Sequence, residues 1–175
     1  MKIEADSVLP FSRDRVFRAY RDELPDFTAY LPNVRAIEVK SRKEQGPLVE
    51  LHNVWHGGGD IPAPVVKILG DSSLSWDDFA KWNETEHFVE WTIRTHVFTE
   101  AVTCGGKNTF IDLGGDRTRL EIQGDISIDV KKVKGVPSFL AGSIGKTVEN
   151  FLVKQITANL TSVSDALTRY LQSKG

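Results

Sequence analysis

The sequence predicts a single α+β domain, spanning residues 1–175, in which an antiparallel sheet packs against a long C-terminal helix. Six segments between residues 34 and 130 alternate apolar and polar residues, which is typical of half-buried strands. The segment after residue 144 instead carries apolar residues at steps of mostly three and four, as a core-facing helix does. Strands grouped together and flanked by helices indicate an α+β fold rather than alternating βα units.

The N-terminal region predicts one strand followed by two short helices. Residues 2–9 suit a strand, and Ser12 is a good N-cap for a helix over about residues 13–23. Pro25 suits the first turn of a second helix. That helix should end at Pro32, because a proline disfavours helical backbone in the residue before it.

Six more strands and the long helix complete the domain, which makes a seven-stranded sheet in all. The expected strands cover residues 34–41, 48–55, 74–82, 86–97, 99–113 and 117–130. The helix is expected from about residue 146 to residue 172, with a start as early as Pro137, and its length would be roughly 40 Å. Only this helix is large enough to cover the apolar face of the sheet, so we expect a curved sheet wrapped around it.

The composition excludes several classes of protein. A net charge of -2 provides no general basic surface for nucleic acid, and the one cysteine, Cys104, excludes an intrachain disulfide. The chain has neither a signal-peptide run nor a stretch of roughly 20 apolar residues. We therefore expect a cytoplasmic protein. The lysines at 131, 132 and 134 suit a solvated turn, or alternatively a transient contact with anionic lipid head groups.

The order of elements and two local stretches resemble a known superfamily. The stretches are LSWDDFAKWNETEHFVEWTI, residues 74–93, and GVPSFLAGSIGKTVENFLVKQ, residues 135–155. They are similar to the START-like superfamily, also called SRPBCC or Bet v 1-like. The resemblance implies the helix-grip fold, with a cavity between the concave sheet face and the helix. Members bind lipids, sterols, polyketides or other hydrophobic ligands, and some are cyclases, hydratases or chaperone regulators. The chain lacks a Rieske module and the glycine-rich phosphate loop of the pollen-allergen branch.

Few residues suggest reactive chemistry. His52 and His56 could hold a metal with Asp60, but their face is opposite the apolar face of the strand, so solvated histidines are the simpler interpretation. The sequence has no HExxH, CxxC or GxSxG motif. Cys104 is interpreted as a small buried thiol rather than a nucleophile. We therefore expect no metal, no cofactor and no catalytic residue.

Asp78 is the most informative of the polar residues on an inward face, which also include Asn53 and Thr95. It shares its strand face with Trp76 and Trp82, and a buried carboxylate must be paired or have a raised pKa. We favour a local twist that turns Asp78 to solvent. In the alternative, Asp78 orients a hydroxyl group of a ligand.

All four tryptophans fall on the face expected to point inward. They suit either core packing or the wall of a ligand cavity, since ligand sites are concave and mainly apolar. We place the ligand under the N-terminal half of the long helix, between residues 137 and 151. The predicted ligand-binding residues are Trp55, Trp76, Asp78, Trp91, Ile93, Phe110, Ile122, Phe139, Ile144, Val148 and Phe151.

These patterns predict a protein that binds or transports a hydrophobic small molecule or lipid, because a cavity-forming architecture comes without a reactive constellation. A polyketide cyclase or hydratase-like enzyme acting on an aromatic substrate is one alternative, and it would need inward polar groups. An interaction module of the Hsp90-activator type is another, and it would need an exposed apolar patch. The segment Ile61 to Gly70 is either a loop packed over the sheet edge or a lid over the cavity mouth.

Overall fold

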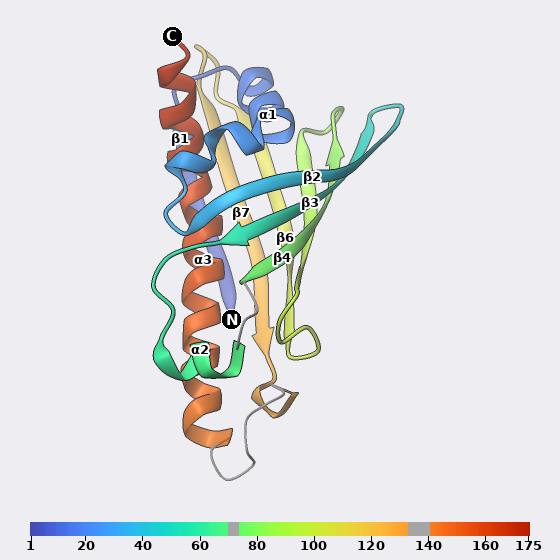
Figure 1. The fold of residues 1–175 in the computed structure, drawn as a ribbon. Helices are drawn as coiled ribbons and strands as arrows, with labels where there is room; N and C mark the ends of the chain where they lie inside the picture. The colour runs from blue at the N-terminus through green and yellow to red at the C-terminus, as the bar shows by residue number, and fades with distance from the viewer. Residues whose placement is uncertain (70–73, 133–140) are drawn as a thin grey trace.

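An antiparallel sheet curves around one long helix in the computed structural model of the chain (Figure 1). The structure describes residues 1–69, 74–132 and 141–175. In these residues the sheet has seven strands, in the order β1-β7-β6-β5-β4-β3-β2, and every neighbouring pair is antiparallel. The strands are β1 (Lys2–Leu9), β2 (Val34–Gln45), β3 (Leu48–Gly57), β4 (Ser75–Asn83), β5 (Phe88–Thr95), β6 (Val102–Asp112) and β7 (Thr118–Ile128).

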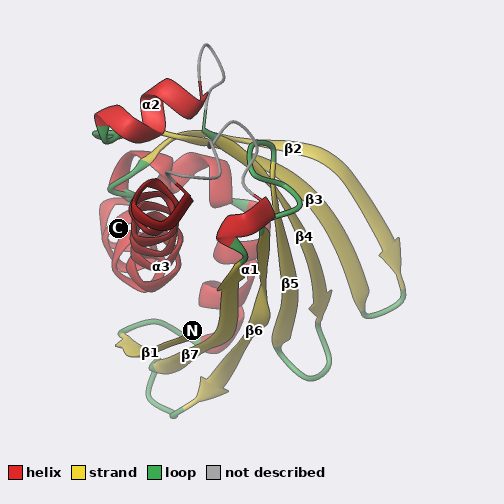
Figure 2. Ribbon diagram, turned by 90° about the horizontal axis from the view of Figure 1, so that it is seen from below, coloured by secondary structure: helices red, strands yellow, loops and turns green. Residues whose placement is uncertain are grey.

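The helices lie on the concave side and at the two ends of the sheet. Helix α3 (Ala141–Ser173) has 33 residues and is therefore about 50 Å long. Figure 2 looks nearly along its axis and shows the sheet curving around it. The shorter elements are α1 (Arg13–Asp22), the 3-10 helix η1 (Leu24–Tyr30), α2 (Ala63–Leu69) and the 3-10 helix η2 (Val130–Lys132).

The apolar stripe expected on the C-terminal helix is confirmed. Its members at 148, 152, 156, 160, 163, 167 and 171 are all buried against the sheet and the N-terminal elements. Irregularities in the pairing of β2 with β3, between Val34 and Ala36 and again between Val39 and Ser41, mark β-bulges. Bulges bend a strand and increase its twist, which helps β2 and β3 wrap over the helix.

The expected α+β architecture and the order of its elements are confirmed, with differences at several boundaries. Strand β2 continues to Gln45, because the hairpin with β3 stays paired to its tip. The segment expected to be a loop or lid contains the short helix α2, in which Val65 is buried and Val66 is exposed. Gly70 lies outside the described residues, as does the earliest predicted helix start, Pro137.

Candidate functional site

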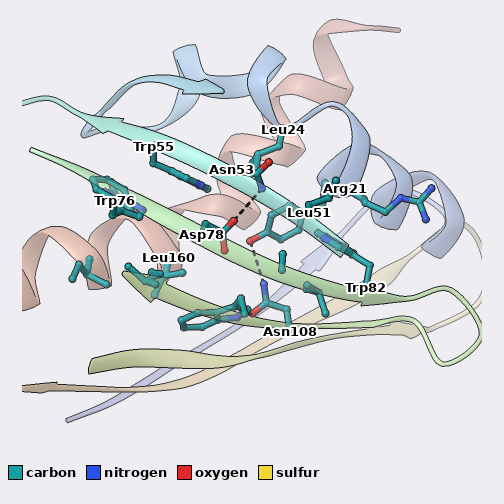
Figure 3. Close-up of a pocket in the computed structure, with 17 residues that line it drawn as sticks. Arg21, Leu24, Leu51, Asn53, Trp55, Trp76, Asp78, Trp82, Asn108 and Leu160 are labelled. Carbon is teal, nitrogen blue, oxygen red and sulfur yellow. Dashed lines mark hydrogen bonds between the residues drawn. The ribbon is translucent and has the colours of Figure 1, made fainter. Parts of the chain in front are cut away.

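A cavity of about 40 Å³ lies between the concave face of β3–β5 and the middle of α3 (Figure 3). Residues of α1 and η1 close one end of it, and Ile156, Asn159 and Leu160 form its helix wall. Its lining residues are mostly apolar and aromatic: Tyr20, Arg21, Leu24, Leu51, Asn53, Trp55, Trp76, Asp78, Ala80, Trp82, Val89, Trp91, Ile93, Asn108, Ile156, Asn159 and Leu160.

The four tryptophans all line this cavity, because each occupies an inward position of its strand. Trp55 and Trp76 are direct cross-strand partners, and their rings stack with centroids 5.8 Å apart. Trp82 lies at the end near α1 and packs edge-to-face on Phe17, at 5.2 Å. Rigid planar rings of this size leave irregular space between them, which explains a cavity at this point of the core.

Trp91 lies across its neighbouring strands, where glycines leave room for it. An ideal Cβ on Gly124 would lie 2.7 Å from Cη2 of Trp91, so the indole occupies the space above that glycine. The indole N–H donates to Oδ1 of Asn108 over 2.8 Å. Nδ2 of Asn108 in turn donates to the hydroxyl of Tyr20 over 3.1 Å. This buried chain fixes Trp91, Asn108 and Tyr20 relative to one another.

Asp78 points into the cavity and not to solvent (Figure 3). The twist that we expected to turn it outward is absent, because β3 and β4 pair without interruption from Leu48 to His56. Asn53 lies directly opposite and donates from Nδ2 to Oδ2 of Asp78 over 3.2 Å. Burial raises the pKa of Asp78 to about 6, although Asn53, Trp55 and the charge of His52 each oppose that rise.

Burial in the cavity and the charge of Asp78 also affect the hydroxyl of Tyr20. Burial is the largest cause that raises its pKa, the negative charge of Asp78 adds to it, and the hydrogen bond from Asn108 opposes it. Tyr20 is therefore a neutral phenol at physiological pH. Among the lining residues that the structure describes, its side chain and the carboxyl of Asp78 are the two ionisable groups besides the guanidinium of Arg21.

Four polar atoms of the cavity residues are buried without a hydrogen-bond partner in the described part of the chain. They are Nε1 of Trp55, Nε1 of Trp82, Oδ1 of Asn53 and Oδ1 of Asn159. The indole N–H of Trp55 is near enough to Asp78 to hold its pKa down, although no atom of the described residues meets the full geometry of a hydrogen bond to it. Buried polar groups are normally paired, so these atoms point to a molecule that would pair with them.

The structure brings together five of the predicted ligand-binding residues and separates the rest. Those in the cavity lining are Trp55, Trp76, Asp78, Trp91 and Ile93. The lining residues missed by the prediction are of two kinds. Those on α1, η1 and the middle of α3 were missed because a strand pattern carries no information about which helix turn covers it. The others lie on inward positions of the strands but were not assigned to the ligand: Leu51, Asn53, Ala80, Trp82, Val89 and Asn108.

The other predicted residues lie elsewhere in the core or outside the described part. Phe110 packs on Phe17, with ring centroids 5.1 Å apart, beneath α1. Ile122 and Val148 are fully buried away from the cavity, and Phe151 lines a separate surface groove of about 480 Å³. Phe139 and the side chain of Ile144 lie outside what the structure describes. The cavity thus lies under residues 156–160 of α3. Of the stretch 137–151, where the ligand was expected, residues 137–140 lie outside what the structure describes.

The histidines of β3 lie on the convex side of the sheet. His52 and His96 contact the two carboxylate oxygens of Asp77 at 2.6 and 3.0 Å, and His56 contacts Glu38. In the described residues, no group of three or more potential ligand side chains is arranged to hold a metal ion. Cys104 is buried, and burial raises the pKa of its thiol to about 12.

Comparison of whole structures identifies the fold. ZhuI aromatase/cyclase from Streptomyces sp. R1128 superposes with a TM-score of 0.65 at 13% identity, covering 100% of this chain and 98% of that one. Ara h 8.0201 has a TM-score of 0.60 at 14% identity, with 99% and 98% covered. A START superfamily protein from Mycobacterium smegmatis has a TM-score of 0.50 at 12% identity, with 93% and 98% covered. This chain has the helix-grip fold of the START-like, or Bet v 1-like, proteins.

Sequence comparison adds nothing to this assignment. No family model matches the sequence, and no curated protein sequence matches it. Identities of this size support the helix-grip fold and leave the ligand to be argued from the residues of this chain. Of the described helices, none has both the length and the apolar character required to span a membrane.

Proposed function

We propose that this protein binds or carries a hydrophobic small molecule or lipid in the cavity between β3–β5 and α3. The observation that carries this proposal is the lining: four tryptophans surround a space whose walls are mostly apolar and which contains a few buried polar atoms without partners. Specific small-molecule sites have this character, with apolar walls for affinity and a few polar groups for orientation.

The size of the cavity adds a condition to the proposal. About 40 Å³ exceeds the roughly 10–15 Å³ required by one water but is well below the roughly 150 Å³ of a cavity that binds benzene. A ligand with one ring or a longer chain must therefore move the walls outward as it enters. Helix α3 and the indoles of Trp55 and Trp76 are the walls that such a ligand would displace.

A cyclase-like enzyme is the second candidate function. It is favoured by one observation, which is that Asp78 and the neutral phenol of Tyr20 are on the cavity side. A carboxyl group with a pKa of about 6 suits proton transfer near neutral pH. The solved structures that share the fold include an aromatase/cyclase. Turnover of an aromatic substrate that is abolished by both Asp78→Asn and Tyr20→Phe would favour this candidate over simple binding.

An interaction module receives less support. The exposed large apolar side chains in the described residues are spread over the N-terminus and five elements: Met1, Val8, Val39, Leu48, Val66 and Phe79. A docking patch would require such side chains to be contiguous. The ring of Phe79 is also partly covered, because it stacks on His52 with centroids 4.6 Å apart.

Native mass spectrometry tests the binding proposal. The protein is purified without denaturants, and its native mass is compared with that of the bare chain before and after extraction with organic solvent. We expect an extractable molecule of defined mass, or uptake of one from an added lipid and small-molecule mixture. A bare chain that takes up nothing from such a mixture would remove both the carrier and the enzyme from consideration.

A further inference from the structure

We propose that the ligand of this cavity is an apolar organic cation, such as a protonated amine, whose positive charge lies against Asp78. This inference rests on the proposed binding function and narrows it from hydrophobic molecules in general to those with one positive charge. Three features of the cavity support it: a carboxyl group without a counter-ion, unpaired acceptor atoms, and aromatic walls.

The first feature is the lack of a cation beside Asp78. In the described chain, no lysine, arginine or histidine forms an ion pair with it, and its one hydrogen bond comes from the neutral amide of Asn53. Arg21 also lines the cavity, but its guanidinium is held by Asp22 and Glu84. Asp78 is half-buried, and a carboxylate partly removed from water without a cation beside it is costly, so a cationic ligand would remove that cost.

The second feature is the kind of atom that lacks a partner. Oδ1 of Asn53 and Oδ1 of Asn159 line the same cavity, and both are acceptors buried without a donor in the part of the chain that the structure describes. The orientation of the Asn53 amide is fixed because its Nδ2 donates to Asp78. An alkylammonium has three N–H donors and no acceptor, so it matches a carboxylate accompanied by amide oxygens. The unpaired indole N–H groups of Trp55 and Trp82 are donors, and such a ligand would contact these rings through their faces instead.

The third feature is the aromatic wall around the carboxyl group. Asp78 lies between Trp76 and Trp82 on the same face of β4, and Trp55 and Trp91 come from the two adjacent strands. Indole faces attract cations, and the attraction is larger where water is excluded. A neutral apolar ligand would gain contact area from these rings but would leave the charge of Asp78 uncompensated.

The ionisable groups around Asp78 define how pH affects this binding. From α1, Tyr20 stays neutral and Arg21 stays charged; β5 and α3 contribute only uncharged residues to the lining. From β3, His52 acts through the sheet from the opposite face, where it contacts Asp77. Ionisation of Asp78 is therefore the event in the cavity that changes its affinity for a cation between about pH 5 and about pH 8.

The experiment compares two probes that differ in one group, 2-phenylethylamine and 2-phenylethanol, by calorimetry and tryptophan fluorescence. The amine stays protonated over the range tested, because alkylammonium groups have pKa values of about 10. We expect the amine to bind at least tenfold more tightly than the alcohol at pH 8. Its affinity should fall about tenfold between pH 8 and pH 5, because a carboxyl group with a pKa near 6 is then about one-tenth ionised. The alcohol should show no such fall.

Two variants locate the effect. Asp78→Asn should remove both the preference for the amine and its pH dependence. Asp6→Asn makes the same chemical change at an exposed position of β1, outside the cavity lining, and should retain both. The pH profile of the unmodified protein provides a test that does not depend on how well either variant folds.

The outcomes separate this inference from the proposed function. If the alcohol binds as tightly as the amine, or the affinity for the amine does not change with pH, the cation assignment is wrong and hydrophobic binding stands. If Asp78→Asn retains the preference for the amine, the charge is recognised elsewhere and the assignment is equally wrong. If neither probe binds at any pH, and no molecule is taken up from a lipid mixture, the binding function itself is contradicted.

Discussion

A Cβ atom on Gly106 would lie 2.5 Å from Cζ2 of Trp91 and closer still to the backbone oxygen of Gln123, so the indole of Trp91 and the backbone of β7 together occupy the space that any other residue at position 106 would need. The two residues are cross-strand partners on β5 and β6. Gly106 therefore determines where one wall of the cavity lies. It also allows the Trp91 N–H to reach Asn108, and through it Tyr20.

Gly106→Ala should destabilise the fold by about 3 kcal/mol, because the added methyl group would clash with both the indole of Trp91 and the backbone of β7 at Gln123. Chemical denaturation followed by tryptophan fluorescence measures the change. Gly142→Ala is the control, since a Cβ there meets no atom within 4 Å and alanine favours a helix by up to about 1 kcal/mol. Equal midpoints for Gly106→Ala and the unmodified protein would contradict the close approach of Trp91 and β7 to Gly106.

Asp78→Asn should stabilise the protein at neutral pH and not at pH 4. Burial raises the folded-state pKa of Asp78 to about 6, so between its ordinary value of 3.8 and about 6 the folded protein binds more protons than the unfolded chain. Stability contributed by this group therefore falls as the pH rises through that window. The gain in the variant should be roughly 3 kcal/mol at pH 7, at about 1.36 kcal/mol for each pKa unit. Urea denaturation at both pH values measures it. A variant that is less stable at pH 7 would indicate that the carboxylate is already paired.

Tyr170→Phe should cost about 1.5 kcal/mol at pH 7, because the hydroxyl donates to Oε2 of Glu23 over 2.8 Å and connects the end of α3 to α1. The hydrogen bond from Arg15 is the largest cause that lowers the pKa of Glu23. The stability contributed by the ionised carboxylate of Glu23 is present above the ordinary carboxyl pKa and is lost as the pH falls through the lowered pKa of Glu23. The cost of the substitution should therefore shrink in strong acid.

Thermal unfolding across a pH series measures this effect, with Tyr30→Phe as the matched control. The hydroxyl of Tyr30 has no hydrogen bond in the described residues, so its removal should leave the melting temperature nearly unchanged. If the two variants lose the same stability, the hydroxyl contact between α3 and the N-terminal segment does not contribute.

Ala80→Val should block ligand binding while leaving the protein folded. Ala80 lines the cavity from β4, and two added methyl groups would fill much of a space of about 40 Å³. The affinity for any ligand found in the native protein should fall at least tenfold in calorimetry. Ala36→Val makes the same change at an exposed position of β2 and should bind as the unmodified protein does. Unchanged binding in Ala80→Val would place the ligand outside this cavity.

The sequence predicted the architecture because periodicity reports which face of each element is buried. It placed Trp55, Trp76 and Trp91 inward for the same reason, and all three line the cavity. It could not predict which turn of a 33-residue helix lies over those rings, since every turn carries the same apolar stripe. Residues of α1 and η1 were missed because tertiary packing alone brings Tyr20 and Leu24 to the end of the cavity.

For Asp78, the strand pattern alone would have been sufficient, and the energetic argument set against it was wrong. Its strand position predicted an inward side chain, but the high cost of a buried carboxylate favoured a twist that would turn it outward. The regular pairing of β3 with β4 keeps it inward, and Asn53 provides the one hydrogen bond that the structure assigns to it. A carboxyl group in so costly a position is a reasonable marker of a functional site.

The most direct test of the cavity as a ligand site uses the indole N–H signals of the four tryptophans in a ¹⁵N NMR titration. All four rings line the cavity, and the N–H groups of Trp55 and Trp82 lack a hydrogen-bond partner in the described structure. Titration with small aromatic and aliphatic probes should shift these signals together, saturate at one molecule per chain, and lose its effect in Ala80→Val. If no probe shifts any indole signal, or the shifts persist unchanged in Ala80→Val, the cavity between the sheet and α3 is not the ligand site.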